Sequence, residues 1–453
     1  MPDPILSPEE QREGLEHLKA LIRMDTSNPP GREGRVAAYL AGVLDRERVP
    51  YELVEGARGR GMLVARLSAA PDRAGPDNDG LLLSAHMDVV PADPVSWTHP
   101  PFRAIEADGC VWGRGAVDMK HMLAASLMAI VTAKRHGWTL ERDLVFAAVA
   151  DEEEGCENGS LYLAREHPGL LRARYCLTEV GGFTLQVGSR TLVPVGVGTK
   201  GFAWLRVKAR GEPGHGSLPD PDSAPSRLLK ALAPIAEGVI ETRLCSPAAA
   251  FIAAVASSLP FPGSLVVRGL TFEALIPRIL NAIPDAEQAR YFRAITHDTA
   301  AVTILKAGTK ENVVPDCAEA LLDVRVLPGR SVREVVEDLS RRLGDRIEVE
   351  VLRSAEPTES AWPGPLWNRI ERAVRASLPS AQVVPYLISG FTDAIAYARL
   401  GITTYGFAPI RLPPDLRFSR LFHGVDERIP VDGFFWGLET LCDVVRRHVT
   451  GAE

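Results

Sequence analysis

Two histidines and several carboxylates stand directly after apolar stretches of this sequence. They occur in five short segments: Ser84–Asp88, Gly113–Asp118, Asp151–Gly155, Leu177–Glu179 and Phe422–Gly424. Imidazole and carboxylate groups are ligands for divalent metals, and bound cations offset the cost of burying such donors at strand ends. The combination points to a hydrolase that uses two metal ions.

Each of these residues also has an ordinary structural explanation. His86 and Asp88 could be a core histidine and a turn residue; in the functional interpretation His86 binds a metal and Asp88 accepts its second ring N–H. Asp118 follows a glycine-rich loop, so a helix cap is the stronger explanation for this residue alone. The other explanation is a carboxylate that bridges two metals.

The acidic run Asp151–Glu154 would ordinarily form a solvated face. Its position after a fully apolar strand argues against this, because like charges at a strand end repel one another unless cations compensate them. Glu179 and His423 are uninformative when each is taken singly. The joint occurrence of all these residues, in this order, favours a metal centre.

Continuous apolar runs and a helical pattern must position these groups. The runs at 81–85 and 144–150 are typical of parallel strands covered on both faces, and 119–136 has the apolar spacing of a helix between them. This pattern predicts a doubly wound, mostly parallel α/β sheet. Ligands of such sheets gather at the carboxyl ends of the strands, where His86, the acidic run and Glu179 stand.

The pattern changes near residue 196. From there it predicts strands and helices in the order β-α-β-β-α-β: 201–211, 223–238, 300–308, 319–328, 331–343 and 347–353. We therefore expect an inserted α+β, ferredoxin-like lid or dimerisation domain over 196–353. The catalytic domain comprises 1–195 and 354–453.

Composition limits the possible functions. The chain has 453 residues and a net charge of -7, and it shows no basic stripe, which argues against a nucleic-acid partner. The N-terminus lacks the features of a signal peptide, and the most apolar stretch, 247–260, is shorter than the ~20 residues of a membrane span. Six scattered cysteines predict reduced thiols in a cytoplasmic protein and exclude thiolate zinc sites.

The segment 244–300 is longer than the lid pattern requires. It carries seven apolar residues that could line an acyl-chain pocket: Phe251, Ile252, Leu259, Phe261, Leu265, Val266 and Val267. Packing within the lid is the favoured alternative.

The assembled motifs resemble the zinc metallopeptidase family of acetylornithine deacetylase, succinyl-diaminopimelate desuccinylase, aminoacylase and carboxypeptidase G. The matching segments are SAHMDVVP (84–91), GRGAVDMK (113–120), DEEEG (151–155), EVGG (179–182) and HGVDE (423–427). The lid also matches, at GEPGHGSLP (211–219), GTKENVVP (308–315) and DVR (323–325). The wording WTHPPF at 97–102 is most similar to the carboxypeptidase S and N-acyl amino acid hydrolase branch.

The resemblance implies two zinc ions per chain, with cobalt or manganese as other possible metals. It implies five ligands: His86 and Glu179 on one metal, Glu153 and His423 on the other, and Asp118 bridging. Asp88 would bind no metal itself but would contact the metal ligand His86, and Glu152 would be the general base.

The lid would supply further groups. His215 would donate to the oxyanion, from the partner's lid in a homodimer. Asn312 and Arg325 would bind the substrate, and Arg325 would do so through the substrate's terminal carboxylate. Gly390 and Asp393 match a substrate-binding turn of the family, with Phe391 in place of a frequent glycine.

We therefore predict metal-dependent hydrolysis of an amide or peptide bond next to an amino acid with a free carboxylate. The small-molecule substrate would be an N-acyl amino acid or a short peptide. The alternatives are a di-metal phosphoesterase, a catalytically silent binding module and a purely structural protein. The glycine-rich motif around His215 has no evident role in a phosphoesterase, and the complete ligand set argues against the other two.

Overall fold

The computed structural model describes residues 4–56, 59–69, 79–236, 238–414 and 416–452. It divides into two compact units. The first unit comprises Met1–Val197, Ser360–Pro385 and Thr392–Glu453, and the second unit comprises Gly198–Glu359 and Tyr386–Phe391. The second unit thus contains most of the range expected to form the lid and adds the short segment Tyr386–Phe391.

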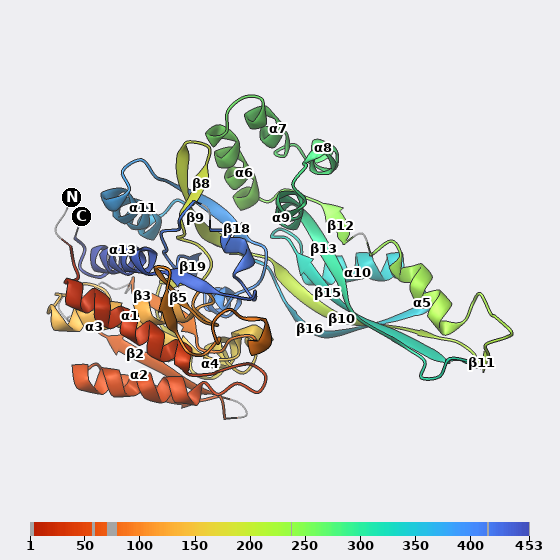
Figure 1. Cartoon of the computed structure of the whole chain (residues 1–453), viewed down its shortest axis with the longest axis horizontal. Coiled ribbons are helices and arrows are strands. Elements are labelled where there is room, and N and C mark those ends of the chain that lie inside the picture. Colours follow the sequence, from red (N-terminus) through yellow and green to blue (C-terminus); the bar gives the residue numbers. More distant parts are fainter. Residues whose placement is uncertain (1–3, 57–58, 70–78, 237, 415, 453) are drawn as a thin grey trace. The chain divides into compact units, whose positions relative to one another are not determined.

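A ten-stranded sheet runs through the first unit (Figure 1). Its spatial order is β1 (Tyr51–Glu55), β2 (Gly61–Leu67), β6 (Leu144–Val149), β3 (Leu81–His86), β7 (Tyr175–Thr178), β19 (Thr403–Gly406), β9 (Arg190–Thr199) and β17 (Thr358–Glu359), with β8 (Leu185–Val187) and β18 (Gln382–Ile388) paired to β9. The central strands β6, β3, β7 and β19 run parallel. Antiparallel pairs flank them on both sides. The parallel strands therefore end at one edge of the sheet, where the predicted ligands follow them.

Helices cover this sheet because its central strands are largely apolar and must be buried on both faces. Every residue of β3 and β6 is buried, as is α3 (Lys120–Arg135) from its start to Ala133. The helix α3 packs on β3, β6, α1 and α13 (Figure 1). The other helices are α1 (Pro8–Arg23), α2 (Gly34–Glu47), α4 (Ser160–Glu166), α11 (Pro365–Ser377), α12 (Ala394–Arg399) and α13 (Val431–Val449).

Short elements complete the first unit. They are the three-stranded sheet of β20 (Arg428–Pro430), β5 (Cys110–Trp112) and β4 (Ile105–Ala107), and the 3-10 turns η2 (Pro94–Ser96), η3 (Glu152–Glu154), η4 (Pro168–Leu171) and η6 (Phe418–Arg420).

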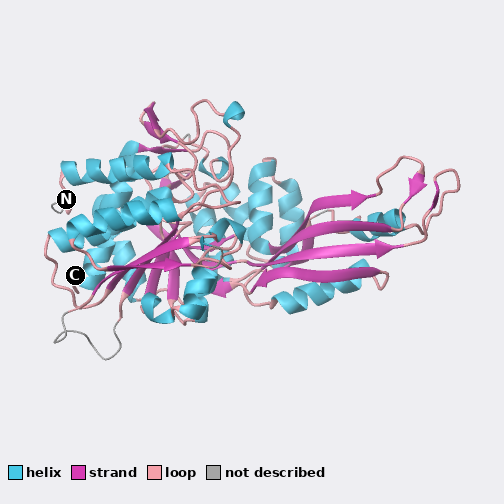
Figure 2. Ribbon diagram, turned by 90° about the horizontal axis from the view of Figure 1, so that it is seen from below, coloured by secondary structure: helices cyan, strands magenta, loops and turns pink. Residues whose placement is uncertain are grey.

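The second unit is built on a five-stranded antiparallel sheet, whose long strands are seen in Figure 2. Its order is β12 (Val239–Thr242), β13 (His297–Ala307), β15 (Cys317–Val326), β10 (Gly201–Arg210) and β16 (Ile347–Ala355). Alternate residues of β10 and β15 form one core with α5 (Ala224–Leu232) and α10 (Val332–Leu343). Both helices therefore lie on the same face of the sheet. The order of the four long strands is ferredoxin-like, which confirms the predicted fold class.

The segment between β12 and β13 forms helices that the sequence pattern did not reveal. They are α6 (Ser246–Ser258), α7 (Gly263–Gly269), α8 (Ile276–Ala282) and α9 (Ala286–Thr296), with the turn η5 (Glu273–Leu275). Two of them, α7 and α8, have only seven residues each, which is too short for their periodicity to be recognised. Phe251 and Ile252 are buried, and the Phe251 ring packs against Tyr291 and Tyr386, whereas Phe261 and Leu265 are exposed. Packing within the second unit therefore accounts for the buried members of this apolar set.

No helix in the described ranges is both long enough and apolar enough to span a membrane.

Candidate metal centre

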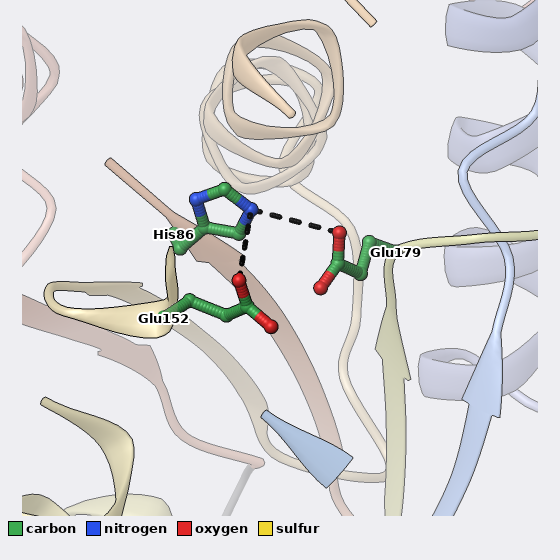
Figure 3. A group of neighbouring side chains, drawn as sticks. All are labelled: His86, Glu152 and Glu179. Atoms are coloured by element: carbon green, nitrogen blue, oxygen red, sulfur yellow. Dashed lines mark ion pairs between the residues drawn. The ribbon is translucent and has the colours of Figure 1, made fainter. Parts of the chain in front are cut away.

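His86 is the centre of the first ligand cluster. It is the last residue of β3, and its side chain is fully buried. Its Nε2 atom lies 3.2 Å from Asp118 Oδ1 and 3.5 Å from Glu179 Oε2. The Glu152 carboxylate comes within 4.0 Å of the same nitrogen. Figure 3 shows Glu152 and Glu179 pointing toward the His86 ring from separate segments of the chain.

Asp118 joins this cluster to a second histidine. Its Oδ1 faces His86, and its Oδ2 lies 3.2 Å from Nε2 of His423. The Oε2 atom of Glu153 lies 3.1 Å from the same His423 nitrogen. A carboxylate whose two oxygens face two histidines has the geometry of a ligand that bridges two metals. The structure thus brings all five predicted ligands together.

The electrostatics of the cluster also fit bound cations. Burial raises the pKa of Glu179 to about 8, although the neighbouring His86 ring opposes this. Burial and the Glu179 charge raise the pKa of Glu152 well above its usual value. Hydrogen bonds to Asp118 and Glu153 raise the pKa of His423 to about 10. Divalent cations would displace the protons that these groups hold, and the mixed nitrogen and oxygen donors suit zinc, cobalt or manganese.

Asp88 connects His86 to the turn that carries Glu152 and Glu153. Its carboxylate accepts hydrogen bonds from the backbone N–H groups of both glutamates, each at 3.2 Å. The Nδ1 atom of His86 lies 3.0 Å from the main-chain carbonyl oxygen of Asp88 and 3.6 Å from its carboxylate. The expected ring hydrogen bond therefore goes to the main chain of Asp88, and its carboxylate holds the turn instead.

Comparison with known proteins identifies the family of the chain. The model of peptidase family M20/M25/M40 matches residues 82–447. The chain belongs to this family.

Relatives and solved structures from several organisms share its sequence or fold. The chain is 29% identical to N-fatty-acyl-amino acid synthase/hydrolase PM20D1 of Mus musculus, over 78% of this chain and 71% of that protein. It is 24% identical to human aminoacylase-1, over 95% of this chain and 94% of that protein. The M20 family metallo-carboxypeptidase Sso-CP2 from Sulfolobus solfataricus shares the fold, with a TM-score of 0.73, 19% identity and coverage of 96% of this chain and 98% of that chain. These likenesses confirm the family resemblance and the prediction of an enzyme that hydrolyses amide or peptide bonds.

In this M20 family member, buried residues that the sequence did not single out anchor the ligand-bearing turns. Asn28 donates from Nδ2 to the Asp88 carboxylate at 2.8 Å. Arg60 donates to Asn28 Oδ1 at 3.2 Å and forms ion pairs with Glu33 and Asp151. These contacts join segments that lie far apart in the sequence. The local sequence shows only a proline-rich run at 27–31. This run predicts a turn but does not indicate which residues the turn contacts.

Glu427 holds the loop that carries Asp118, the predicted bridging ligand. Its fully buried carboxylate accepts hydrogen bonds from Arg114 Nη1 and from the backbone N–H groups of Gly115, Val117 and Asp118. The sequence placed Glu427 in a family motif and gave it no role. Its contacts give it a structural role, which is to hold the loop that carries Asp118.

The ligand-bearing turns adopt backbone conformations that are unusual for their residues. Asp151, Val180 and His423 have positive φ values of 65°, 59° and 55°. A β-branched residue such as Val180 rarely adopts this region, which costs of the order of 1–2 kcal/mol. Such strain typically occurs at functional sites, where the surrounding packing enforces it.

The second unit contains four of the predicted catalytic or substrate-binding residues. The short strand β11 (Gly214–His215) pairs with β14 (Val313–Val314), and the Gly216 N–H donates to the Asn312 carbonyl at 2.9 Å. His215 and Asn312 are both exposed and lie next to each other. The His215 ring contacts the Ser217 hydroxyl at 2.8 Å.

Arg325 stands elsewhere in this unit, on β15. Its Nε and Nη2 atoms donate to the two carboxylate oxygens of Asp323 at 2.8 and 2.9 Å. The guanidinium also lies 5.2 Å from the Phe391 ring centroid, and Phe391 packs on Phe202. Asp323 and Phe391 therefore fix the orientation of Arg325 and leave its remaining N–H donors for a ligand. The neighbouring Gly390 accepts a hydrogen bond from the Lys200 backbone.

Asp393 belongs to the first unit and is fully buried. Burial raises its pKa to about 6, although the His86 charge opposes this. Neither carboxylate oxygen has a hydrogen-bond partner of good geometry among the described residues. This burial favours a supporting position behind the metal centre over the direct substrate contact that the sequence predicts.

Proposed function

We propose that this protein uses two zinc ions to hydrolyse the amide bond between an acyl group, or a second amino acid, and an amino acid with a free carboxylate. The observation that carries the proposal is Asp118, whose two oxygens face His86 and His423, with Glu152 beside them. The names of the relatives support the substrate class: N-fatty-acyl-amino acid synthase/hydrolase and aminoacylase-1. The family description supports the peptidase alternative.

Two metal ions bound here would polarise the scissile carbonyl and the attacking water. Glu152 is the general base: it accepts a proton from the water and passes it to the leaving amine. A buried carboxylate whose pKa is raised suits both steps, because it binds a proton more firmly than an exposed carboxylate and can pass it on to the amine. Asp88 fixes the position of this base through the backbone N–H group of Glu152.

The substrate's free carboxylate would bind to Arg325, which is already oriented by Asp323. Asn312 and Gly390 complete the proposed substrate-binding set, whereas the buried Asp393 has a supporting role. A guanidinium fork favours a carboxylate over a neutral amide at this position.

We also propose that the enzyme is a homodimer in which His215 serves the partner's site. Within one chain, Arg325 pairs with Phe202 at the start of β10, whereas His215 lies beyond the end of that strand at Arg210. The strand between Phe202 and Arg210 spans about 26 Å at ~3.3 Å per residue. An amino acid derivative with a short acyl group cannot contact both Arg325 and His215 of one chain across this distance.

The sheet edge of the second unit supports the same proposal. The strand β12 pairs with β13 only over His297–Thr299, so the rest of β13 has no strand partner on that side among the described residues. This edge exposes Val302, Ile304 and Leu305. Open apolar edges of this kind pair with other chains. Edge pairing of two copies would extend the sheet and join the two second units.

Mixed dimers test this arrangement. Glu152→Ala and His215→Ala are each expected to be inactive, and their co-expression should restore roughly a quarter of wild-type activity, because random pairing gives mixed dimers with one intact site. Verified mixed dimers with no more activity than the single mutants would contradict a His215 that acts on the partner.

We place the protein in the cytoplasm. All six cysteines are free, and four of them are buried, which suits a reducing compartment.

The test of the proposed activity combines metal analysis with a substrate screen. We expect two metal ions per chain and metal-dependent hydrolysis of N-acyl amino acids or dipeptides. A protein that binds metal but hydrolyses only phosphate esters would support the phosphoesterase alternative. A protein that binds no metal under any condition would support a binding module.

A further inference from the structure

The helical segment between β12 and β13 leaves five large apolar side chains exposed, and we call this set the apolar patch. Its members lie on α7, on η5 and in the turns next to them: Phe261 (82% exposed), Leu265 (64%), Val266, Phe272 (60%) and Leu275. Packing within the second unit explains the buried residues of this segment but not these exposed ones. A set of large apolar side chains this close together on a surface usually marks an interaction site.

Short turns hold the apolar patch together. The Leu265 N–H donates to the Pro262 carbonyl at 3.0 Å, and the Phe272 N–H donates to the Gly269 carbonyl at 3.1 Å. The Leu275 side chain lies beside Gly269, at the end of α7. The patch is therefore one compact region around α7 (Figure 1).

The inner side of this region is already packed. Leu270, Ile276 and Leu280 are buried, and the Glu273 carboxylate accepts a hydrogen bond from the Leu244 N–H at 2.8 Å. These contacts determine which side chains face outward. A short helical region that is apolar on both sides is normally buried on both sides, and no described residue covers the outer side here.

The charge of the region indicates what could cover it. Residues 246–282 contain only three charged side chains, Arg268, Glu273 and Arg278, so their net charge is +1 in a chain whose net charge is -7. Both arginines are exposed. Neither forms an ion pair with a described residue, so both guanidinium groups remain available to an anion.

A second copy of the chain fits this surface poorly. A twofold contact through the patch would place the same arginines opposite each other, and like charges repel. An anionic bilayer fits both features. The apolar side chains would enter the boundary between headgroups and acyl chains, and Arg268 and Arg278 would contact lipid phosphates.

We propose that the apolar patch, with Arg268 and Arg278, binds the protein reversibly to the surface of a membrane that contains anionic phospholipid. This inference goes beyond the proposed hydrolase function, and its test measures binding rather than activity. It agrees with the proposed cytoplasmic location, because the cytoplasmic leaflet of cell membranes carries anionic lipids.

Vesicle sedimentation tests the proposal with the full-length, metal-loaded protein. One set of vesicles contains phosphatidylcholine with about 30% phosphatidylglycerol, and the other contains phosphatidylcholine alone. We expect binding to the anionic vesicles to be stronger by about tenfold or more and to weaken as salt is added. Absence of binding, or equal binding to the two kinds of vesicle, would overturn the proposal.

One pair of variants tests the apolar side chains. The double substitution Phe261→Ser and Phe272→Ser removes both aromatic rings of the patch. The matched control is Leu53→Ser and Val95→Ser, because these two side chains of the first unit are also well exposed. All four positions are on the surface, so we expect both variants to fold, and circular dichroism checks this.

A second pair tests the charges. Arg268→Gln and Arg278→Gln together remove the two arginines of the patch. The control Arg372→Gln and Arg399→Gln changes the net charge equally at exposed positions of the first unit.

We expect each patch variant to bind anionic vesicles about tenfold more weakly or worse and each control to bind like the wild type. Equal losses in a patch variant and its control would overturn the assignment of this surface. Self-association that the patch variants abolish, seen by light scattering in a protein that binds no vesicles, would assign the patch to a second copy of the chain and overturn the membrane proposal.

Discussion

Glu152 and Glu153 are neighbours in the turn η3, and we predict that the same substitution has different effects at the two positions. Glu153 lies 3.1 Å from His423 and is expected to be a metal ligand. The Glu152 carboxylate lies within 4.0 Å of His86 Nε2. Glu152, Glu179 and His86 are close enough together to bind one metal ion (Figure 3). The proposed role of Glu152 as the base therefore needs a direct test.

Replacement of Glu152 by Gln removes the proton acceptor and keeps the size of the side chain. The Glu152 side chain is only 8% exposed, so bulk water cannot readily replace it as the base. General acid–base catalysis by one group contributes roughly 100- to 10,000-fold, or about 3–5 kcal/mol of the activation barrier. We expect kcat to fall by this amount, KM to change little and both metals to remain bound.

Glu153→Gln is the matched control. It weakens one ligand of the second metal, so we expect about one metal per chain to be lost, with partial recovery of activity at high metal concentration. Metal content is measured by plasma mass spectrometry and folding by circular dichroism. Metal loss from Glu152→Gln combined with full occupancy in Glu153→Gln would refute the assigned roles and exchange them.

Three further predictions concern the support, the substrate grip and the protons of the site. Glu427→Gln should lower the free energy of unfolding by about 3–5 kcal/mol, because it leaves the buried Arg114 unpaired. The control Glu439→Gln affects only two backbone amides and should lower the free energy of unfolding by about 1 kcal/mol. Equal losses for the two variants in urea unfolding would contradict this prediction. Arg325→Lys should raise KM about tenfold for substrates with a free carboxylate and leave amidated analogues unchanged, and equal changes would remove Arg325 from the site. Since its carboxylate partners raise the pKa of His423 to about 10, metal-free protein should hold this stabilisation fully below pH 6.5 and lose it as the pH rises through 10; a His423→Asn variant with the same pH dependence of unfolding would contradict the assignment.

The sequence by itself predicted which polar residues gather at one edge of the large sheet. Apolar runs such as Leu144–Val149 form buried parallel strands, and parallel strands end at one edge of the sheet, so polar residues that follow them must meet there. The strand predicted at 319–328 is likewise present, as Cys317–Val326, and its side chains alternate between a buried and a less buried face. Both arguments depend on local periodicity, which a single sequence displays directly.

Contacts between distant segments were decided only by the tertiary structure. Nothing local indicates that Asn28 meets Asp88, or that Glu427 gathers four donors from the loop before α3. The segment 244–300 is apolar along most of its length, and only its packing shows that Phe251 is buried whereas Phe261 is exposed. The separation of Arg325 from His215 follows from the register of β10 and β15, which pairs the start of one strand with the end of the other. Such features depend on how elements pack in three dimensions, and periodicity along the chain carries no information about that packing.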